Sequence, residues 1–420
     1  MATLRERLTS AAFVAGWDLV SRLPESVARG LFNFGADVAW RRQGAGVRVL
    51  EGNLLRVLGT EGASAFTADS PGPGVAGTGG LPASVAASPG SGADGAGVDG
   101  AELRALSRQV MRSYARYYLE TFRMQAIPDE RIATGMHVNF DQADRTLEYM
   151  KNGRGVIYAL PHMGDFEQAG RWVVGYGAGS FTTVAERLKP DAVFQLFLDF
   201  RQGLGMEVLP TTGGPHPFGV MAQRLRAGKL VCIVADRDLS DTGVEVDFFG
   251  EKALFPAGPA SLAVQTGAAL MPVSCWFEGE DEWGAHIYDE IGVPAQGTRK
   301  EKAAAMTQTL AAVFEEAIRE HPQDWHMLQK LFVRDLDPDR LARSRNRVIS
   351  NGNGNGKTNG NANGNGDLRS DAPLASPAPP ASAPPLASPE LQPSAPLASP
   401  ESLPSPESPA PPAPPAGGAP

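Results

Sequence analysis

The stretch GVIYALPHMGDFEQAG, residues 155–170, places an apolar run directly before an imidazole and two acids. The apolar run includes β-branched and aromatic side chains and predicts a buried strand, with His162 just past its end. Asp165, followed by Gln168 three residues later, is typical of a helix capping box. Glu167 would then lie in the first helical turn, where its charge suits the helix dipole. We therefore expect a titratable cluster at a strand-to-helix junction.

Strand-like and helix-like segments alternate along the chain beyond this junction. That order predicts an α/β fold with a largely parallel central sheet flanked by helices. In such sheets ligands bind beyond the carboxyl ends of the strands, which is where His162 is expected. The predicted strands after the first are 180–186, 206–211, 230–236 and 269–277, and the predicted helices are 191–204, 217–227, 257–267 and 299–320.

The N-terminal part of the chain reads as amphipathic helices. Apolar residues recur three and four positions apart in 1–58, with a break near Pro24. A further helix is predicted over 101–124, and it carries four arginines at four-residue spacing: Arg104, Arg108, Arg112 and Arg116. Two interpretations of this cationic stripe stay open, a solvated helix face or a surface for anionic lipid headgroups.

Two segments are set apart by their composition. Residues 59–100 are rich in Gly, Ala, Ser and Pro with few large apolar side chains, which predicts a disordered insertion. Residues 346–420 begin as an Asn-Gly tract and become rich in Pro, Ala and Ser, which predicts a flexible, semi-extended tail. The folded domain is therefore expected to consist of 1–58 and 101–345.

Several classes of protein are disfavoured by what the sequence contains. The net charge of −9 argues against nucleic-acid binding. Cys232 and Cys275 lie inside apolar runs, as buried free thiols of a protein in a reducing cytoplasm would. No apolar run approaches the roughly 18 residues of a membrane-spanning helix. The Gly-x-Ser-x-Gly, Walker and His-Glu-x-x-His motifs are missing, and the scattered histidines leave a transition-metal site short of ligands.

The cluster around His162 suggests acid–base chemistry. A carboxylate bound to one ring nitrogen would fix the tautomer and support the imidazolium, which leaves the other nitrogen to take a proton from an alcohol. We expect Glu167 in this role, because Asp165 is assigned to helix capping. A glycine-rich and aromatic segment at 244–263 is predicted to be a loop that leads to a helix N-terminus near Gly258. Such a loop would suit the wall of an apolar-chain site or an anion site.

Charged residues also follow other predicted strands. One group is Glu186 and Arg201, and the other is Asp236, Arg237 and Asp238. Arginine in these groups suits bidentate recognition of phosphate. For the second group, an internal ion-pair network is the alternative.

The motifs together resemble those of glycerolipid and lipid A type acyltransferases, in the lysophospholipid acyltransferase superfamily. The His-x-x-x-x-Glu spacing is followed, in order, by AERLKP, DFRQGLG, ADRDLS, VDFFGEKALFPAGPA and HPQDWHMLQKLF. The N-terminal LVSRLPESVARGLFNFGADVAWRRQGAGVRVLEGNLLRV is similar to the actinobacterial branch, the phosphatidylinositol mannoside acyltransferases. The resemblance covers nearly all of 1–57 and 101–345.

The resemblance implies a reaction and a location. A long acyl chain would pass from acyl-CoA, a substrate, to a mannose hydroxyl of phosphatidylinositol mannosides, with no metal and no bound cofactor. The protein would sit peripherally on the anionic cytoplasmic face of the cell membrane. His162 and Glu167 would be the catalytic pair, and the remaining charged residues would contact the acceptor or phosphate groups: Glu186, Arg201, Asp236, Arg237 and Asp238. The competing hypotheses are a metal-dependent phosphoesterase and a non-catalytic lipid-binding protein.

Overall fold

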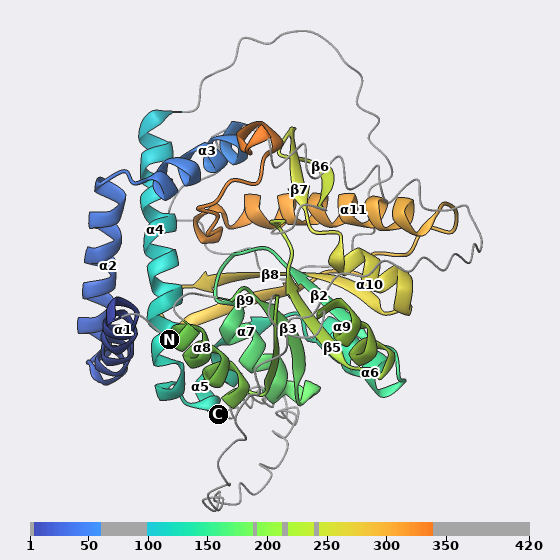
Figure 1. The fold of residues 1–420 in the computed structure, drawn as a ribbon, viewed down its shortest axis with the longest axis horizontal. Helices are drawn as coiled ribbons and strands as arrows, with labels where there is room; N and C mark the ends of the chain where they lie inside the picture. Colours follow the sequence, from blue (N-terminus) through green and yellow to red (C-terminus); the bar gives the residue numbers. More distant parts are fainter. Residues whose placement is uncertain (1–3, 60–98, 188–190, 212–216, 239–242, 339–420) are drawn as a thin grey trace, which may run out of the picture. The chain divides into compact units, whose positions relative to one another are not determined.

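The computed structural model of the chain describes residues 4–59, 99–187, 191–211, 217–238 and 243–338 (Figure 1). The predicted tail, 346–420, lies outside the described residues, and so does the predicted insertion apart from residue 59 and residues 99–100. All described residues belong to one unit, Met1–Asn359.

A seven-stranded sheet forms the centre of the fold, with the strand order β1-β9-β8-β2-β5-β3-β4. Every neighbouring pair from β8 to β4 is parallel, and only β9 runs antiparallel to β8. This arrangement confirms the predicted α/β fold with a largely parallel sheet. The strands are β1 (Met136–Val138), β2 (Val156–Leu160), β3 (Phe181–Ala185), β4 (Met206–Pro210), β5 (Leu230–Val234), β8 (Ala269–Glu278) and β9 (Glu282–Ile287).

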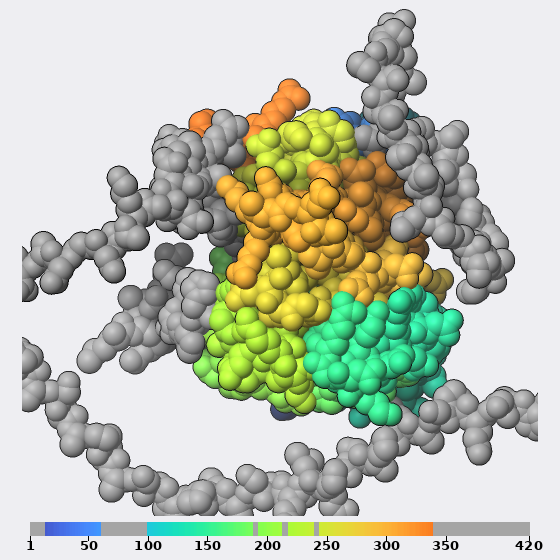
Figure 2. Space-filling model, turned by 90° about the vertical axis from the view of Figure 1, so that its right-hand side faces the viewer, coloured from blue at the N-terminus to red at the C-terminus, as the bar shows by residue number. Residues whose placement is uncertain are grey.

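Helices cover both faces of this sheet (Figure 1). One face packs against α9 (Pro217–Arg226), α10 (Gly258–Thr266) and α11 (Arg299–Glu320), whose outer surfaces adjoin one another in Figure 2. The other face packs against α5 (Asp129–Gly135), α6 (Phe140–Lys151), α7 (Phe166–Val173) and α8 (Asp191–Gly203). The N-terminal helices α1 (Leu4–Arg22), α2 (Glu25–Arg41) and α3 (Ala45–Gly59) gather around α4 (Gly100–Arg123) beside the sheet. The predicted helix break near Pro24 is confirmed.

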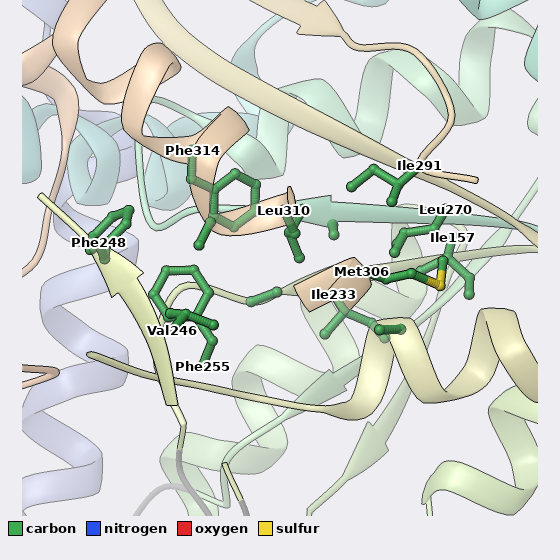
Figure 3. Close-up of a cluster of buried hydrophobic side chains, with 14 of the residues drawn as sticks. Ile157, Ile233, Val246, Phe248, Phe255, Leu270, Ile291, Met306, Leu310 and Phe314 are labelled. Atoms are coloured by element: carbon green, nitrogen blue, oxygen red, sulfur yellow. The ribbon is translucent and has the colours of Figure 1, made fainter. Parts of the chain in front are cut away.

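The buried strands send alternate side chains to the two faces, because successive residues of a strand point in opposite directions. Ile157 of β2 belongs to the cluster under α11, whereas Tyr158 belongs to the cluster on the α7 face. Figure 3 shows Ile157 and Leu270 of the sheet close to Met306 of α11, in one continuous core. Both faces of the central strands are therefore buried, which explains their almost uninterrupted apolar sequences.

The segment predicted to be a loop is in fact a β-hairpin. β6 (Val244–Phe248) and β7 (Glu251–Phe255) pair antiparallel. The two linking residues, Phe249 and Gly250, have φ angles of 48° and 74°, as a tight hairpin turn of left-handed residues requires. The turn could not be recognised from the sequence because one of its two residues is phenylalanine, which rarely adopts positive φ. Phe248, Phe249 and Phe255 are buried in the core beneath α11, so they form no wall of a ligand site. The predicted helix start at Gly258 is correct.

The arginine stripe of α4 is bound within the N-terminal helices. Both Arg108 and Arg112 make paired hydrogen bonds to Asp37 of α2, which hold the pKa of that carboxyl well below its usual value. Arg104 binds Glu51 of α3 at 2.8 Å. Arg116 binds Glu120 at 2.5 Å on its own helix. Each guanidinium of the stripe therefore has a carboxylate partner in the fold, while Arg104, Arg108 and Arg112 keep 41%, 39% and 43% of their side chains exposed.

Candidate active site

Three side chains with titratable groups follow three neighbouring parallel strands. His162 comes after β2, Asp236 after β5 and Glu186 after β3, and β5 lies between the other two strands. The backbone N–H of Ala235 donates to the carbonyl of Leu160 at 2.7 Å, so the pairing of β2 and β5 continues one residue past both strands. The sheet therefore brings these side chains to one edge, where a doubly wound fold binds its ligands.

His162 and Asp236 are directly bonded at this edge. Nδ1 of His162 lies 2.5 Å from Oδ1 of Asp236, and the His162 backbone N–H donates to Oδ2 at 2.9 Å. Trp325 donates its indole N–H to the same Oδ2 at 3.0 Å. Burial alone would raise the pKa of Asp236, but the His162 charge and these three donors lower it below its usual value. An ionised carboxylate accepts a hydrogen bond from Nδ1–H, so the neutral form of the ring has its lone pair on Nε2 and can act there as a hydrogen-bond acceptor and base.

Glu167, expected to orient His162, is bound elsewhere. Its Oε1 accepts a hydrogen bond from Nε of Arg201 at 2.9 Å, and Nη2 of Arg201 binds the same oxygen. The Tyr117 hydroxyl approaches Oε1 at 3.3 Å. Although burial would lower the pKa of Arg201, the Glu167 charge raises it. The orienting role is therefore corrected in favour of Asp236, because a neighbouring strand brings Asp236 level with His162 whereas Glu167 extends from α7 toward α8.

Asp165 caps α7, as its sequence context predicts. Its Oδ1 accepts the backbone N–H of Gln168 at 3.0 Å. The reciprocal half of the capping box is missing, since the amide atoms of Gln168 have no hydrogen-bond partner within the described residues. Complete burial, and secondarily the nearby Glu120, raise the pKa of Asp165 well above its usual value. Asp165 therefore favours its neutral form, and its role in this structure is to cap α7.

A cavity of about 380 Å³ opens beside His162, within the range of small-molecule sites. The predicted site residues His162, Glu167, Glu186, Arg201 and Arg237 all line it. Asp236 is fully buried behind His162, and Asp238 is 4% exposed and does not line the cavity. The cavity then extends between α7 and the sheet, where its walls are apolar: Val138, Leu160, Trp172, Val173, Phe181, Met206, Val273, Ala285 and Ile287.

Residues 98–334 match the protein family described as bacterial lipid A biosynthesis acyltransferase. The chain belongs to this acyltransferase family. It is also 40% identical over 338 residues to a protein of Mycolicibacterium smegmatis, a match that covers 80% of this chain and 95% of the relative. A Mycobacterium tuberculosis protein is 40% identical over 340 residues, with 81% and 93% covered. Both relatives are named phosphatidylinositol mannoside acyltransferase. The family resemblance read from the motifs is thereby confirmed.

The acyltransferase also has site residues for which the sequence motifs predicted no role. Trp325 and His326 come from a segment that pairs with the His162 segment through a bridge between Met163 and Trp325. They lie in the HPQDWHMLQKLF motif, which contributed to the resemblance but suggested no contact with His162. Aromatic and imidazole groups so far along the chain give no local signal of such a contact. Tyr117 of α4 joins the site in the same way, through Glu167.

Both cysteines of the acyltransferase are free thiols. Cys275 is buried in β8, and Cys232 of β5 lines the cavity. Burial raises the pKa of both thiols, so they stay protonated.

No helix in the described part of the chain is long and apolar enough to span a membrane. The same residues contain no group of three or more side chains placed to share a metal ion.

Proposed function

We propose that this acyltransferase moves a long-chain acyl group from acyl-CoA to a mannose hydroxyl of a phosphatidylinositol mannoside. The observation that carries the proposal is His162 at the head of an apolar cavity. Its Nδ1 is held by a buried carboxylate, and its Nε2 has no hydrogen-bond partner among the described residues. The names of the relatives support the mannoside acceptor. A thioester donor suits the site, because thioesters react with an activated hydroxyl without a covalent enzyme intermediate.

The proposed reaction is direct attack by the acceptor hydroxyl. Nε2 of His162 takes the hydroxyl proton as the oxygen bonds to the thioester carbonyl carbon. Asp236 stabilises the resulting imidazolium through Nδ1–H. The carbon–sulfur bond then breaks, and the departing CoA thiolate takes the proton from Nε2. The products are the ester and free CoA, and His162 returns to its starting form.

The acyl chain is proposed to lie in the apolar part of the cavity. Side chains from β2, β3, β8 and β9 form its floor and α7 forms its roof, so a flexible hydrocarbon would be shielded from water. Each buried methylene contributes about 0.8 kcal/mol to binding. Long acyl chains should therefore be preferred as donors over short ones.

Charged groups at the open end are proposed to bind polar parts of the substrates. Arg237 lines the cavity, and its Nε has no hydrogen-bond partner among the described residues. Glu186 stands 3.9 Å from that guanidinium and is 62% exposed. We assign Arg237 to a substrate phosphate and Glu186 to a sugar hydroxyl. Glu167 is assigned to holding Arg201 at the cavity wall.

Purified enzyme should release CoA from palmitoyl-CoA, and mannosylated inositol lipids should accelerate that release while an acylated lipid accumulates. The rate is expected to persist in EDTA. Inorganic phosphate release that stops with EDTA would instead support the phosphoesterase hypothesis. Tight binding of the lipid without CoA release would support the non-catalytic hypothesis.

The face of α2 turned away from α4 is proposed to contact the membrane surface. Val27, Leu31 and Phe34 recur at helical spacing and are 47%, 56% and 66% exposed. Arg41 and Arg42, at the end of the same helix, are exposed as well. An apolar stripe with cations beside it is typical of a helix that lies in the headgroup region of an anionic bilayer.

Replacing Leu31 and Phe34 with serine should lower binding to vesicles of phosphatidylinositol and phosphatidylcholine by about tenfold, because the pair loses partial burial of two apolar side chains. Sedimentation with the vesicles measures the bound fraction, which should also fall as salt rises. Phe140→Ser is the matched control, since Phe140 is 51% exposed on α6. Equal effects of the two variants would contradict the assignment of α2.

A further inference from the structure

A second histidine borders the same cavity as His162. The backbone N–H of His326 donates to the carbonyl of His162 at 2.7 Å, and the backbone N–H of Gly164 donates to the carbonyl of Asp324 at 2.9 Å. These bonds fasten 324–326 alongside 162–164. The His326 ring consequently lines the cavity next to the catalytic imidazole, although it is only 5% exposed.

A buried chain of hydrogen bonds fixes which nitrogen of His326 carries the proton. Oδ1 of Asp324 lies 2.6 Å from the Ser113 hydroxyl, and that hydroxyl lies 2.8 Å from Nε2 of His326. Oδ2 of Asp324 accepts the backbone N–H of Phe277 at 3.2 Å and the Gln323 amide at 3.3 Å. A carboxylate with these donors takes the Ser113 proton. The hydroxyl oxygen must then accept its other hydrogen bond from Nε2–H of His326.

The His326 ring is neutral, and its Nδ1 is a hydrogen-bond acceptor that the described residues do not use. Burial, with the nearby His162 charge, lowers the pKa of His326 to about 3, whereas burial raises the pKa of Asp324 to about 6. At neutral pH the carboxyl is therefore mostly ionised and the imidazole uncharged. With its proton on Nε2, the ring presents the Nδ1 lone pair, which has no partner among the described residues. Such an acceptor needs a ligand that brings its own proton donor.

We propose that Nδ1 of His326 accepts a hydrogen bond from a hydroxyl of the acceptor sugar, and thereby selects the acceptor. This inference rests on the proposed function. The rings around His326 suit a sugar, because Tyr114 and Tyr117 stand with centroids 5.4 and 6.1 Å from it and can cover an apolar sugar face. A site built to bind a hydroxyl rejects an analogue that lacks it, because its own polar group is left unpaired.

The test compares two amide variants of His326. Glutamine places its amide near Nε2, so His326→Gln keeps the contact with Ser113 but loses the acceptor at Nδ1. Asparagine places its amide oxygen near Nδ1, so His326→Asn keeps that acceptor. We expect His326→Gln to lower kcat/KM for the mannoside acceptor at least tenfold, mainly through KM, and to lower it far more than it lowers His162-dependent hydrolysis of palmitoyl-CoA by water. His326→Asn should recover most of the acceptor kcat/KM.

A series of monodeoxy mannosides completes the experiment. With the unmodified enzyme, one deoxy acceptor should show the same loss of kcat/KM that His326→Gln shows with the full sugar. Combining that deoxy acceptor with His326→Gln should cause no further loss. Equal losses in acyl transfer and in hydrolysis, or additive losses with every deoxy sugar, would overturn the inference alone. If the unmodified enzyme releases no CoA in a His162-dependent way, the proposed function fails and this inference fails with it.

Discussion

His162→Ala is expected to lower kcat/KM for acyl transfer by about 10²- to 10⁴-fold, the usual cost of removing a general base. The loss should appear in kcat, because the imidazole acts on a proton that moves only as the ester bond forms. CoA release from palmitoyl-CoA in the presence of a mannosylated acceptor measures it. His162→Ala removes one of the three donors to the buried Asp236, so the melting temperature should fall, and activity is compared at a temperature at which both proteins are folded.

His137→Ala is the matched control for this substitution. His137 is 53% exposed, binds Glu282 at 2.8 Å and does not line the cavity. Its loss should leave acyl transfer within about twofold of the unmodified enzyme, as for a typical surface substitution. If both variants kept full activity, the proton would have to be taken by another group, and the proposed mechanism would be wrong.

The framework of the site was predictable from the sequence because it depends on local signals. Buried parallel strands need continuous apolar runs, and the runs ending at Leu160 and Val234 are the central strands β2 and β5. The carboxyl end of a strand is where such folds bind ligands, which singled out His162. Asp165 was recognisable as a cap from its spacing to Gln168 alone.

The pairing of acids with bases could not be predicted in the same way. Asp236 and Glu167 were both near a strand end, and only the strand order shows that β5 is the neighbour of β2. The arginines of α4 looked free because Asp37 and Glu51 lie far from them in sequence. Knowledge of which strands are adjacent would have favoured Asp236 over Glu167, since pairing of β2 with β5 puts Asp236 and His162 at the same level.

Asp236→Asn should impair turnover as severely as the loss of His162, and for a specific structural reason. The position of Oδ2 receives two N–H donors, from Trp325 and from the His162 backbone, so the asparagine oxygen must occupy it. The amide NH₂ then faces Nδ1 of His162 and donates to it. The ring proton is thereby forced onto Nε2, which can no longer act as a base. We expect a loss in kcat on the order of 10²- to 10⁴-fold with little loss of affinity for the substrates.

Glu167→Gln should act in a different way, and the comparison decides between the two carboxylates. Removing its charge leaves Arg201 as a buried cation without its ion-pair partner, which costs on the order of 3 kcal/mol of stability. The melting temperature should fall and KM should rise, while kcat falls much less than for Asp236→Asn. Asp165→Asn is the control, because asparagine caps helices as well as aspartate and burial already favours a neutral side chain there. An unchanged kcat in Asp236→Asn, together with a collapse of kcat at full stability in Glu167→Gln, would show that Glu167 supports the imidazolium during turnover.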